Sequence, residues 1–569
     1  MVRPRTLLWS GLLTIVVGLL GSLGGCGGGS SGLAHSGNSG GSGDPDSPAS
    51  IYLTFQDLPP AILQLGKGVA VSALVTNDSS NSGVNWTCAP AGTCGSFKPV
   101  HTASGAATTY TAPLSFSPGA VTISGTSVAN SKKIVSAQAT MTPIQHVVII
   151  FQENRSTDNL FQDPNLISAG ADIVNVGLDH LGQQIPLTPG PLAVGFDPDH
   201  SHTAFVNAYD NGKMDGADLN TKGCYGQCGQ YPEYTSVDPS QVGPYFQMAE
   251  QYVFADHMFE TNQGPSYPAH QYILSATAVP STQSNLFVAG NPYGNIQPGG
   301  DTGCTAPADQ EVALIDATDG ALSQTPPCFE HPTLTDFMDS QHLSWRYYTP
   351  NGGDFWTAPN SINHMCLPKN VNGQLECTSA DWTNNVIQNF KQVLTDIAGG
   401  QLGSVTWVIP SGQVSDHPQE TDGTGPSWVA SVVNAVGNSP FWANTVIFIA
   451  WDDWGGFYDH VPPFNIRNQY EYGLRVPMII VSPYAKTGYI SHAPHHFGSI
   501  LKYIEETLGL PAVGARSGVN YSDAYPDTDD LSDCFDYAAT PTTFQTIPAP
   551  LGKKYFLKDK SVPLPPDTD

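Results

Sequence analysis

Positive charge is scarce in this chain. Its 569 residues include 21 Lys and Arg against 49 Asp and Glu, which gives a formal net charge of −28 at pH 7. Binding to nucleic acid requires basic side chains that neutralise phosphates, so this balance predicts no nucleic-acid partner. It also argues against electrostatic docking on an anionic membrane. The hydrophobic fraction of 40% is that of a globular protein, and the length predicts two or more domains.

Several catalytic motifs are absent or misplaced. No His-Glu-x-x-His string occurs, which argues against a zinc metalloprotease. Cysteine repeats with the spacing of a zinc site are also absent. The Gly-x-Ser-x-Gly strings at residues 28–32 and 37–41 lie in a Gly/Ser-rich stretch, which cannot form the strand–helix elbow of a carboxyl-ester hydrolase. A protease and a carboxyl-ester hydrolase are therefore weakly supported alternatives.

Long apolar runs are missing except at the N-terminus. Arg3 and Arg5 precede an apolar run at residues 7–20, which is the pattern of an export signal, and the run leads to a Leu-Gly-Gly-Cys string that resembles a bacterial lipobox. We therefore predict a lipoprotein signal peptide at residues 1–26, with Cys26 as the lipidation site. The protein would be exported to the cell envelope, lipid-anchored or periplasmic or extracellular. An ordinary signal or a short membrane anchor is the alternative.

Nine further cysteines follow Cys26, which is typical of an oxidising compartment. Neighbours in the sequence suggest four disulfides, although the connectivity cannot be deduced from sequence and stays open. The suggested pairs are Cys88–Cys94, Cys224–Cys228, Cys304–Cys328 and Cys366–Cys377, with Cys534 left over.

Composition divides the chain into four further segments. Residues 27–48 are almost wholly Gly, Ser, Asn, Asp and Pro, which predicts a flexible linker. Residues 50–142 contain short alternating runs, typical of an Ig-like β-sandwich module. Residues 143–515 alternate strand-like and helix-like segments, which predicts an α/β domain, and residues 516–569 form a polar tail that we expect to pack loosely. Strands are predicted at residues 145–151, 404–409, 445–451 and 475–482.

Two of these strands end in oxygen-bearing side chains. The first leads into Glu153 and Asn154, and the third leads into Asp452 and Asp453. Ligands of open α/β sheets bind beyond the carboxyl ends of strands, so neighbouring strands would bring these side chains into one crevice. Adjacent side chains on a strand point to opposite faces, and Gly455 permits the break that both acids need to reach one ion. A solvated turn is the alternative for the acid pair.

Six strings, in a fixed order over about residues 143–510, resemble the bacterial phosphoesterase family of phospholipases C and AcpA-type acid phosphatases. The strings are Glu153-Asn154-Arg155-Ser156, Gly212–Gly216, Gly264-Pro265-Ser266, Asp416-His417-Pro418, Trp451–Pro463 and Arg475–Tyr484. The resemblance implies an alkaline-phosphatase-like α/β/α sandwich that hydrolyses phosphate esters with a Ser or Thr nucleophile at a metal site.

By this resemblance Ser266 is the catalytic nucleophile, and one divalent cation is held by five residues. These ligands are Glu153, Asn154, Ser266, Asp452 and Asp453. The oxygen set suits Ca²⁺, Mg²⁺ or Mn²⁺ better than copper. Ser266 also opens a helix-like segment with Pro268 in its first turn, and the N–H groups of a helix N-terminus favour a phosphate. A plain helix-capping serine is the alternative.

Histidines stand in several of the matching strings. His417, His202 and His200 resemble family histidines that contact phosphate or protonate the leaving group, and His364 is a weaker candidate. A lone histidine is more often structural. Two further residues are assigned to substrate binding with an alternative each: Lys213 could instead close a turn, and His460 could instead bond to Asp459.

The sequence therefore predicts an exported phosphoric ester hydrolase of the acid phosphatase or phospholipase C type. Its partners would be a phosphate ester, a phospholipid being one form, and the membrane through the lipid anchor. Ser266 stands where the phospholipase C members often carry Thr, and the chain ends soon after the core; both features favour the acid-phosphatase branch. A surface adhesin with a catalytically inactive α/β domain is the non-enzyme alternative.

Overall fold

The computed structural model describes residues 50–114, 120–224, 228–294, 301–516 and 520–563. The predicted signal peptide with Cys26 and the predicted linker lie outside these ranges. Residues Ile51–Asp569 form one compact unit, to which the description is confined. Among the helices of the described ranges, none has both the length and the apolar character needed to cross a bilayer.

Two β-sheets occupy the first part of this unit, in the strand orders β1-β3-β7-β5 and β2-β9-β8-β4-β6. Alternate side chains such as Val71, Trp86, Tyr110 and Ile123 form their buried core, as the alternating sequence pattern predicts. Strands are present in this region, whereas the all-β Ig-like module and its boundary at residue 142 stay predictions. The strands are β1 (Tyr52–Asp57), β2 (Ile62–Gln64), β3 (Gly68–Thr76), β4 (Val84–Ala89), β5 (Ser96–Lys98), β6 (His101–Thr102), β7 (Thr108–Thr111), β8 (Ala120–Ser127) and β9 (Ile134–Thr142).

An eight-stranded sheet forms the centre of the following region, in the order β23-β20-β24-β10-β25-β26-β15-β27. Its strands are β23 (Val386–Ile387), β20 (Trp345–Tyr348), β24 (Val405–Val408), β10 (His146–Gln152), β25 (Thr445–Trp451), β26 (Met478–Val481), β15 (Val253–Ala255) and β27 (Tyr489–Ser491). All four strands predicted from apolar runs are present, with ends shifted by three residues or fewer. All side chains of β25 are buried, as expected for a strand covered on both faces.

Strand direction decides where the polar side chains meet. β10 is parallel to β24 and β25, β26 runs antiparallel to β25 and β15, and β15 is parallel to β27. Consequently β10, β25, β15 and β27 all point the same way, and their carboxyl ends lie along one edge of the sheet. The residues that directly follow β10, β25, β15 and β27 therefore gather along this edge.

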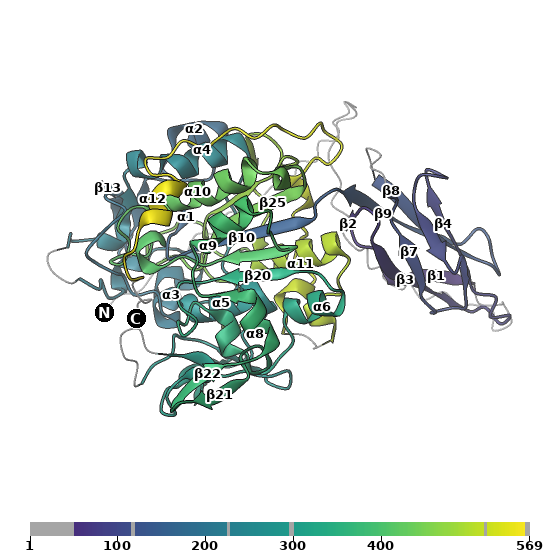
Figure 1. Cartoon of the computed structure of the whole chain (residues 1–569), viewed down its shortest axis with the longest axis horizontal. Coiled ribbons are helices and arrows are strands. Elements are labelled where there is room, and N and C mark those ends of the chain that lie inside the picture. The colour runs from purple at the N-terminus through teal and green to yellow at the C-terminus, as the bar shows by residue number, and fades with distance from the viewer. Residues whose placement is uncertain (1–49, 115–119, 225–227, 295–300, 517–519, 564–569) are drawn as a thin grey trace, which may run out of the picture. The chain divides into compact units, whose positions relative to one another are not determined.

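Helices cover both faces of this sheet, which gives the predicted α/β layering. α4, α9 and α12 contact α10, whereas α6 and α11 contact α5. Figure 1 shows α4 and α10 on one side of strands β10 and β20, and α5 on the other. The helices are α1 (Thr157–Leu160), α2 (Pro164–Ala169), α3 (His202–Tyr209), α4 (Gly243–Gln251), α5 (Ser266–Ser275), α6 (Leu334–Ser340), α7 (Asn363–Cys366), α8 (Ala380–Asn385), α9 (Gln392–Ala398), α10 (Gly425–Gly437), α11 (Phe497–Leu508) and α12 (Lys553–Lys558).

Small sheets fill the insertions between these elements. They are formed by β11 (Val176–Leu178) with β12 (Gln184–Pro186), β13 (Thr188–Gly190) with β14 (Thr235–Val237), β16 (Met258–Phe259) with β28 (His495–His496), β17 (Leu286–Val288) with β18 (Val312–Asp316) and β19 (Leu322–Thr325), and β21 (Pro368–Val371) with β22 (Gln374–Cys377).

The four suggested disulfides are all present, and Cys534 is buried with a free thiol. The expectation of a loosely packed C-terminal tail is wrong. Leu531, Phe535, Ile547 and Phe556 are buried in the main hydrophobic core, because the polar tail carries apolar side chains at intervals that reach back to the domain.

Candidate active site

The segment after β10 turns sharply toward the end of β25. Asn154 has a φ of +58°, a left-handed conformation that Asn tolerates better than most residues. In this turn the backbone N–H of Asn154 donates to Asp452 Oδ1 at 2.8 Å, and the N–H of Arg155 donates to the carbonyl of Asp453 at 3.0 Å. The two strand ends are therefore bonded directly to each other.

The segment after β25 breaks where the sequence predicts. Gly455 has a φ of +63°, and a Cβ atom there would lie 2.2 Å from the carbonyl oxygen of Asn154. Only glycine fits so close an approach. Its N–H donates to Asp453 Oδ1 at 2.7 Å, so the break also fixes the second acid. This geometry lets Asp452 and Asp453 face the same space.

Ser266 comes to this space from a third element. It is the first residue of α5, is buried, and its Oγ donates to Asp453 Oδ2 at 3.2 Å. The amide nitrogen of Asn154 donates to the same oxygen at 3.4 Å. The structure thus brings the predicted nucleophile beside the predicted ligands Glu153, Asn154, Asp452 and Asp453, which we call the oxygen cluster.

The oxygen cluster concentrates carboxyl groups away from the protein surface. Its four side chains are 0% exposed. Burial, followed by the neighbouring Asp452 carboxylate, raises the pKa of both Glu153 and Asp453 well above the usual range. Among the described residues, Glu153 Oε2, Asn154 Oδ1 and Asp452 Oδ2 have no hydrogen-bond partner. A buried unpaired oxygen costs about 1–3 kcal/mol, so this arrangement calls for a cation.

The donor chemistry fits a hard divalent cation. Carboxylate, amide and hydroxyl oxygens from one compact space are the ligand types of Ca²⁺, Mg²⁺ and Mn²⁺. The three unpartnered oxygens come from three different residues, so one ion could satisfy all of them. The residues present therefore fit the implied metal.

Two of the predicted histidines border the oxygen cluster. Asn154 Nδ2 donates to His200 Nε2 at 3.0 Å, while His200 Nδ1 donates to the Pro198 carbonyl at 2.9 Å. Burial alone would lower the pKa of His200, but Asp197 and other groups raise it above the usual value. The ring of His417 lies 6.0 Å from that of His200, and burial lowers its pKa to about 3.

A third predicted histidine lies beside the nucleophile's loop. His202 Nδ1 donates to the carbonyl of Gln263 at 2.8 Å, three residues before Ser266. Burial lowers its pKa. The structure therefore places His202 next to the segment that carries the nucleophile, through a contact with the backbone.

The remaining predicted residues lie elsewhere. His364 pairs with Glu330 at 2.7 Å and with Asp336 at 3.2 Å, and its pKa is raised to about 9, because these carboxylates outweigh the effect of burial. Lys213 is mostly exposed and pairs with Asp210 three residues earlier, which matches the turn-closing alternative.

His460 is bonded to neighbouring acids. Its Nδ1 lies 2.7 Å from Asp158 and its Nε2 lies 3.0 Å from Asp172, while Asp459 pairs with Arg475. Burial lowers the pKa of His460, but Asp158 and Asp459 outweigh this effect and raise the pKa to about 9. His460 is therefore bonded to acids, as the alternative predicts, but its partners are Asp158 and Asp172 and not Asp459.

Sequence reasoning missed His270. It lies on α5 four residues after Ser266, and its Nε2 lies 3.1 Å from Glu153 Oε1. Burial lowers its pKa to about 4, so the ring is neutral and Nε2–H donates to the carboxylate. Residues four apart share one face of a helix, and this spacing is the signal that could have identified it.

A Ser–His–Asp arrangement also occurs, away from the oxygen cluster. Ser491 Oγ lies 3.0 Å from His495 Nε2, and His495 Nδ1 lies 2.8 Å from Asp529. Ser491 and His495 are both 0% exposed, and Ser491 Oγ also donates to Asp533 at 2.5 Å. The Ser491 hydroxyl donates its proton to Asp533 and not to His495, so the arrangement gives no support to a carboxyl-ester hydrolase.

Comparisons with known proteins show the family of the chain. The model of the Phosphoesterase family matches residues 144–511, and the chain belongs to this family. Phospholipase C B of Mycobacterium tuberculosis is 23% identical over 473 residues, covering 70% of this chain and 79% of that protein. Hemolytic phospholipase C of Pseudomonas aeruginosa is 22% identical over 428 residues, covering 65% and 53%.

A solved structure described as a protein in the alkaline phosphatase superfamily, from Vibrio parahaemolyticus, matches with a TM-score of 0.30 and 9% identity over 68% of this chain and 70% of that one. The predicted family membership is confirmed by the family match. The chain is accordingly a hydrolase acting on phosphoester bonds, and the adhesin with an inactive domain is not favoured.

Proposed function

We propose that the chain is an exported phosphoric ester hydrolase that uses Ser266 as a nucleophile beside one divalent cation held by the oxygen cluster. The observation that carries the proposal is the meeting of Ser266 Oγ with the buried oxygens of two adjacent strand ends, three of which have no partner among the described residues. Four disulfides support an oxidising compartment outside the cytoplasm.

The residues of the site divide the reaction between them. Ser266 Oγ would bond to phosphorus while the bond from phosphorus to the leaving oxygen breaks, and water would later cleave the phosphoserine. Helix α5 begins at Ser266 and directs its N-terminal dipole at the phosphate. A cation, when bound, neutralises the carboxylates and polarises coordinated oxygens. His200 and His417 border the site and would contact the phosphate or the leaving group, as would His202 from beside Gln263.

The substrate is a phosphomonoester or a phosphodiester such as a phospholipid. The named relatives are phospholipases C, which favours a diester, whereas a serine nucleophile favours the acid-phosphatase branch. Turnover of p-nitrophenyl phosphate against p-nitrophenyl phosphorylcholine separates the two classes. Chelation should abolish turnover of whichever substrate is used, and added Mg²⁺, Ca²⁺ or Mn²⁺ should restore it.

Ser266→Ala tests the nucleophile. We expect less than a tenth of wild-type turnover at every cation concentration. Ser275→Ala is the matched control, because Ser275 is also a buried serine of α5 but lies at its other end, about 14 Å along the helix axis. Turnover of Ser266→Ala above a tenth of wild type, with Ser275→Ala unchanged, would contradict the proposal.

A further inference from the structure

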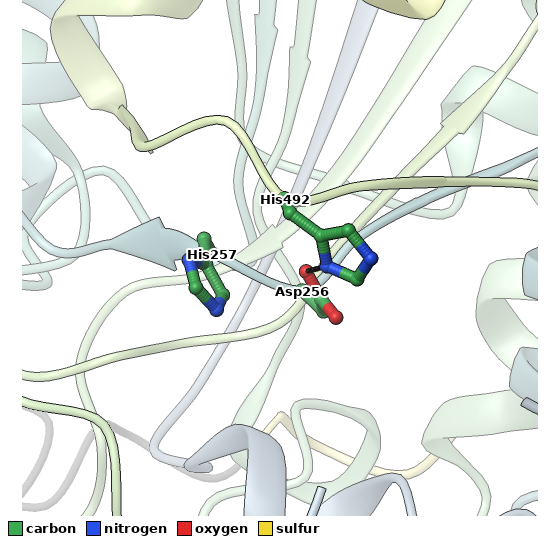
Figure 2. A group of neighbouring side chains, drawn as sticks. All are labelled: Asp256, His257 and His492. Atoms are coloured by element: carbon green, nitrogen blue, oxygen red, sulfur yellow. Dashed lines mark hydrogen bonds and ion pairs between the residues drawn. The ribbon is translucent and has the colours of Figure 1, made fainter. Parts of the chain in front are cut away.

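A second group of metal-ligand side chains lies along the same sheet edge, at the ends of β15 and β27. Asp256 and His257 follow β15 directly, and His492 follows β27. These two strands pair in parallel with Ala255 opposite Ser491, so the next residues, Asp256 and His492, also lie opposite each other. We call Asp256, His257 and His492 the histidine group; Figure 2 shows the His492 ring against the Asp256 carboxylate, with His257 to one side of them.

The contacts within the histidine group are short. His492 Nδ1 lies 2.9 Å from Asp256 Oδ1, and one ligand atom from each of the three residues lies within 4.8 Å of the others. A fourth donor lies beside them: Asp172 Oδ2 is 3.0 Å from His257 Nε2, and the N–H of Asp172 donates to Asp256 Oδ2 at 2.8 Å. Asp172 therefore borders the group through His257 and Asp256, while its other carboxylate oxygen pairs with His460 at 3.0 Å.

Two positive groups lie next to the histidine group, and neither takes the oxygens that face its imidazoles. His460, whose pKa is raised to about 9, pairs with the other oxygen of Asp172 at 3.0 Å. Arg475 is the buried guanidinium next to the group, and it donates to the backbone carbonyls of Asp172 and Asp256. Its charge is balanced by two other carboxylates, Asp158 at 3.1 Å and Asp459 at 2.9 Å. Asp256 Oδ1 and Asp172 Oδ2 consequently remain directed at His492 and His257 respectively.

The environment also allows an ion to enter. Asp256 is fully buried and fixed, whereas the side chains of His257 and His492 are 26% and 54% exposed. The half-exposed rings can turn toward an ion without disturbing the core. Imidazole and carboxylate ligands together suit Zn²⁺ and other first-row transition ions, in contrast to the oxygen-only cluster.

We propose that Asp256, His257 and His492, with Asp172 as the fourth donor, bind one Zn²⁺-type divalent ion independently of the oxygen cluster. The ion would join the ends of β15 and β27 to the segment that carries Asp172. Zn²⁺ would replace the two ion pairs between imidazole and carboxylate with direct coordination, and the imidazoles would bind as neutral ligands.

The test is a Zn²⁺ titration of the full chain in excess Mg²⁺, read by calorimetry and by the absorption of Co²⁺ used as a stand-in. Wild type should bind one Zn²⁺ that His257→Ala and His492→Ala each weaken at least tenfold, with loss of the Co²⁺ bands. Asp452→Asn, in the oxygen cluster, should retain this Zn²⁺. His180→Ala is the matched control, because His180 is a partly exposed histidine paired with Asp218 outside the group.

Two results would overturn the proposal. One is an equal Zn²⁺ affinity in wild type and in both histidine variants. The other is Zn²⁺ binding that disappears in Asp452→Asn and persists in His257→Ala, which would place the ion in the oxygen cluster. His492 is more than half exposed, so His492→Ala is expected to fold, and an unchanged melting temperature without metal would verify this.

Discussion

The oxygen cluster and the histidine group lie on the same edge of one sheet and differ in how their charges are satisfied. In the oxygen cluster every side chain is buried and three oxygens have no protein partner among the described residues. In the histidine group each imidazole already pairs with a carboxylate, and the rings reach solvent. Buried carboxylates that lie close together require a cation to balance their charge. Carboxylates that are already paired with imidazoles near solvent can bind a cation but do not require one. Loss of the first ion should therefore be far more costly than loss of the second.

The largest effect should come from the oxygen cluster itself. Asp452→Asn removes one negative charge and one strong ligand, so we expect the cation concentration for half-maximal turnover to rise by about a hundredfold or more. Turnover measured against added Mg²⁺, Ca²⁺ and Mn²⁺ gives this value. Asp422→Asn, at an exposed aspartate, is the control. An unchanged cation requirement in Asp452→Asn would remove Asp452 from the ligand set.

This cluster was predictable because each step follows from a local pattern. Continuous apolar runs predict buried parallel strands, and the carboxyl ends of such strands lie side by side. Gly455 predicts the break in the chain after β25. The opening of α5 at Ser266 follows from the helix-like composition with Pro268 in the first turn.

Other features depend on distant pairing that sequence does not encode visibly. Asp256 and His492 meet only through the register of β15 and β27, strands of three residues each that have no periodicity to detect. His364 lies in a long insertion between strands, where no regular pattern fixes a position relative to the sheet. The burial of the tail depends on isolated apolar residues such as Phe556, which form no apolar run or periodic pattern in the sequence.

His270 should have the next largest effect, because it connects the helix of Ser266 to Glu153. His270→Ala removes the Nε2–H donor, so we expect a roughly ten- to hundredfold higher cation requirement. His270→Gln retains a donor that can reach Glu153 and should recover much of the loss. A purely structural role would instead lower the melting temperature of both variants alike and leave the cation requirement unchanged.

The next largest effect should be on thermal stability, which should depend on a cation in the oxygen cluster and not on the histidine group. An ion at a hundred times its dissociation constant stabilises the folded state by about 2.7 kcal/mol. We expect the chelated protein to melt a few degrees lower, and Mg²⁺ or Ca²⁺ to restore the wild type and His257→Ala equally. Thermal unfolding followed by circular dichroism measures this. If hard cations fail to stabilise the chelated wild type, the oxygen cluster does not require a cation and the contrast with the histidine group is wrong.

An effect of similar size on stability, with none on the cation requirement, concerns a buried carboxylate outside both groups. Burial raises the pKa of Glu233 from 4.5 to about 7, so the folded state holds its proton more tightly than the unfolded state. Stability from this group is complete below about pH 4.5 and is lost as the pH rises toward 7. Glu233→Gln should remove this loss of about 2–3 kcal/mol and leave the cation requirement unchanged. Denaturant unfolding of the wild type and of Glu233→Gln at pH 5 and pH 8 measures the change in the free energy of unfolding.

An anomalous-scattering map of crystals grown with Mn²⁺ and vanadate tests the central claim most directly. The account predicts one strong peak within about 2.5 Å of oxygens from Glu153, Asp452 and Asp453, with vanadium bonded to Ser266 Oγ. A map with no metal among these side chains, or with vanadium bonded to another residue, would contradict it.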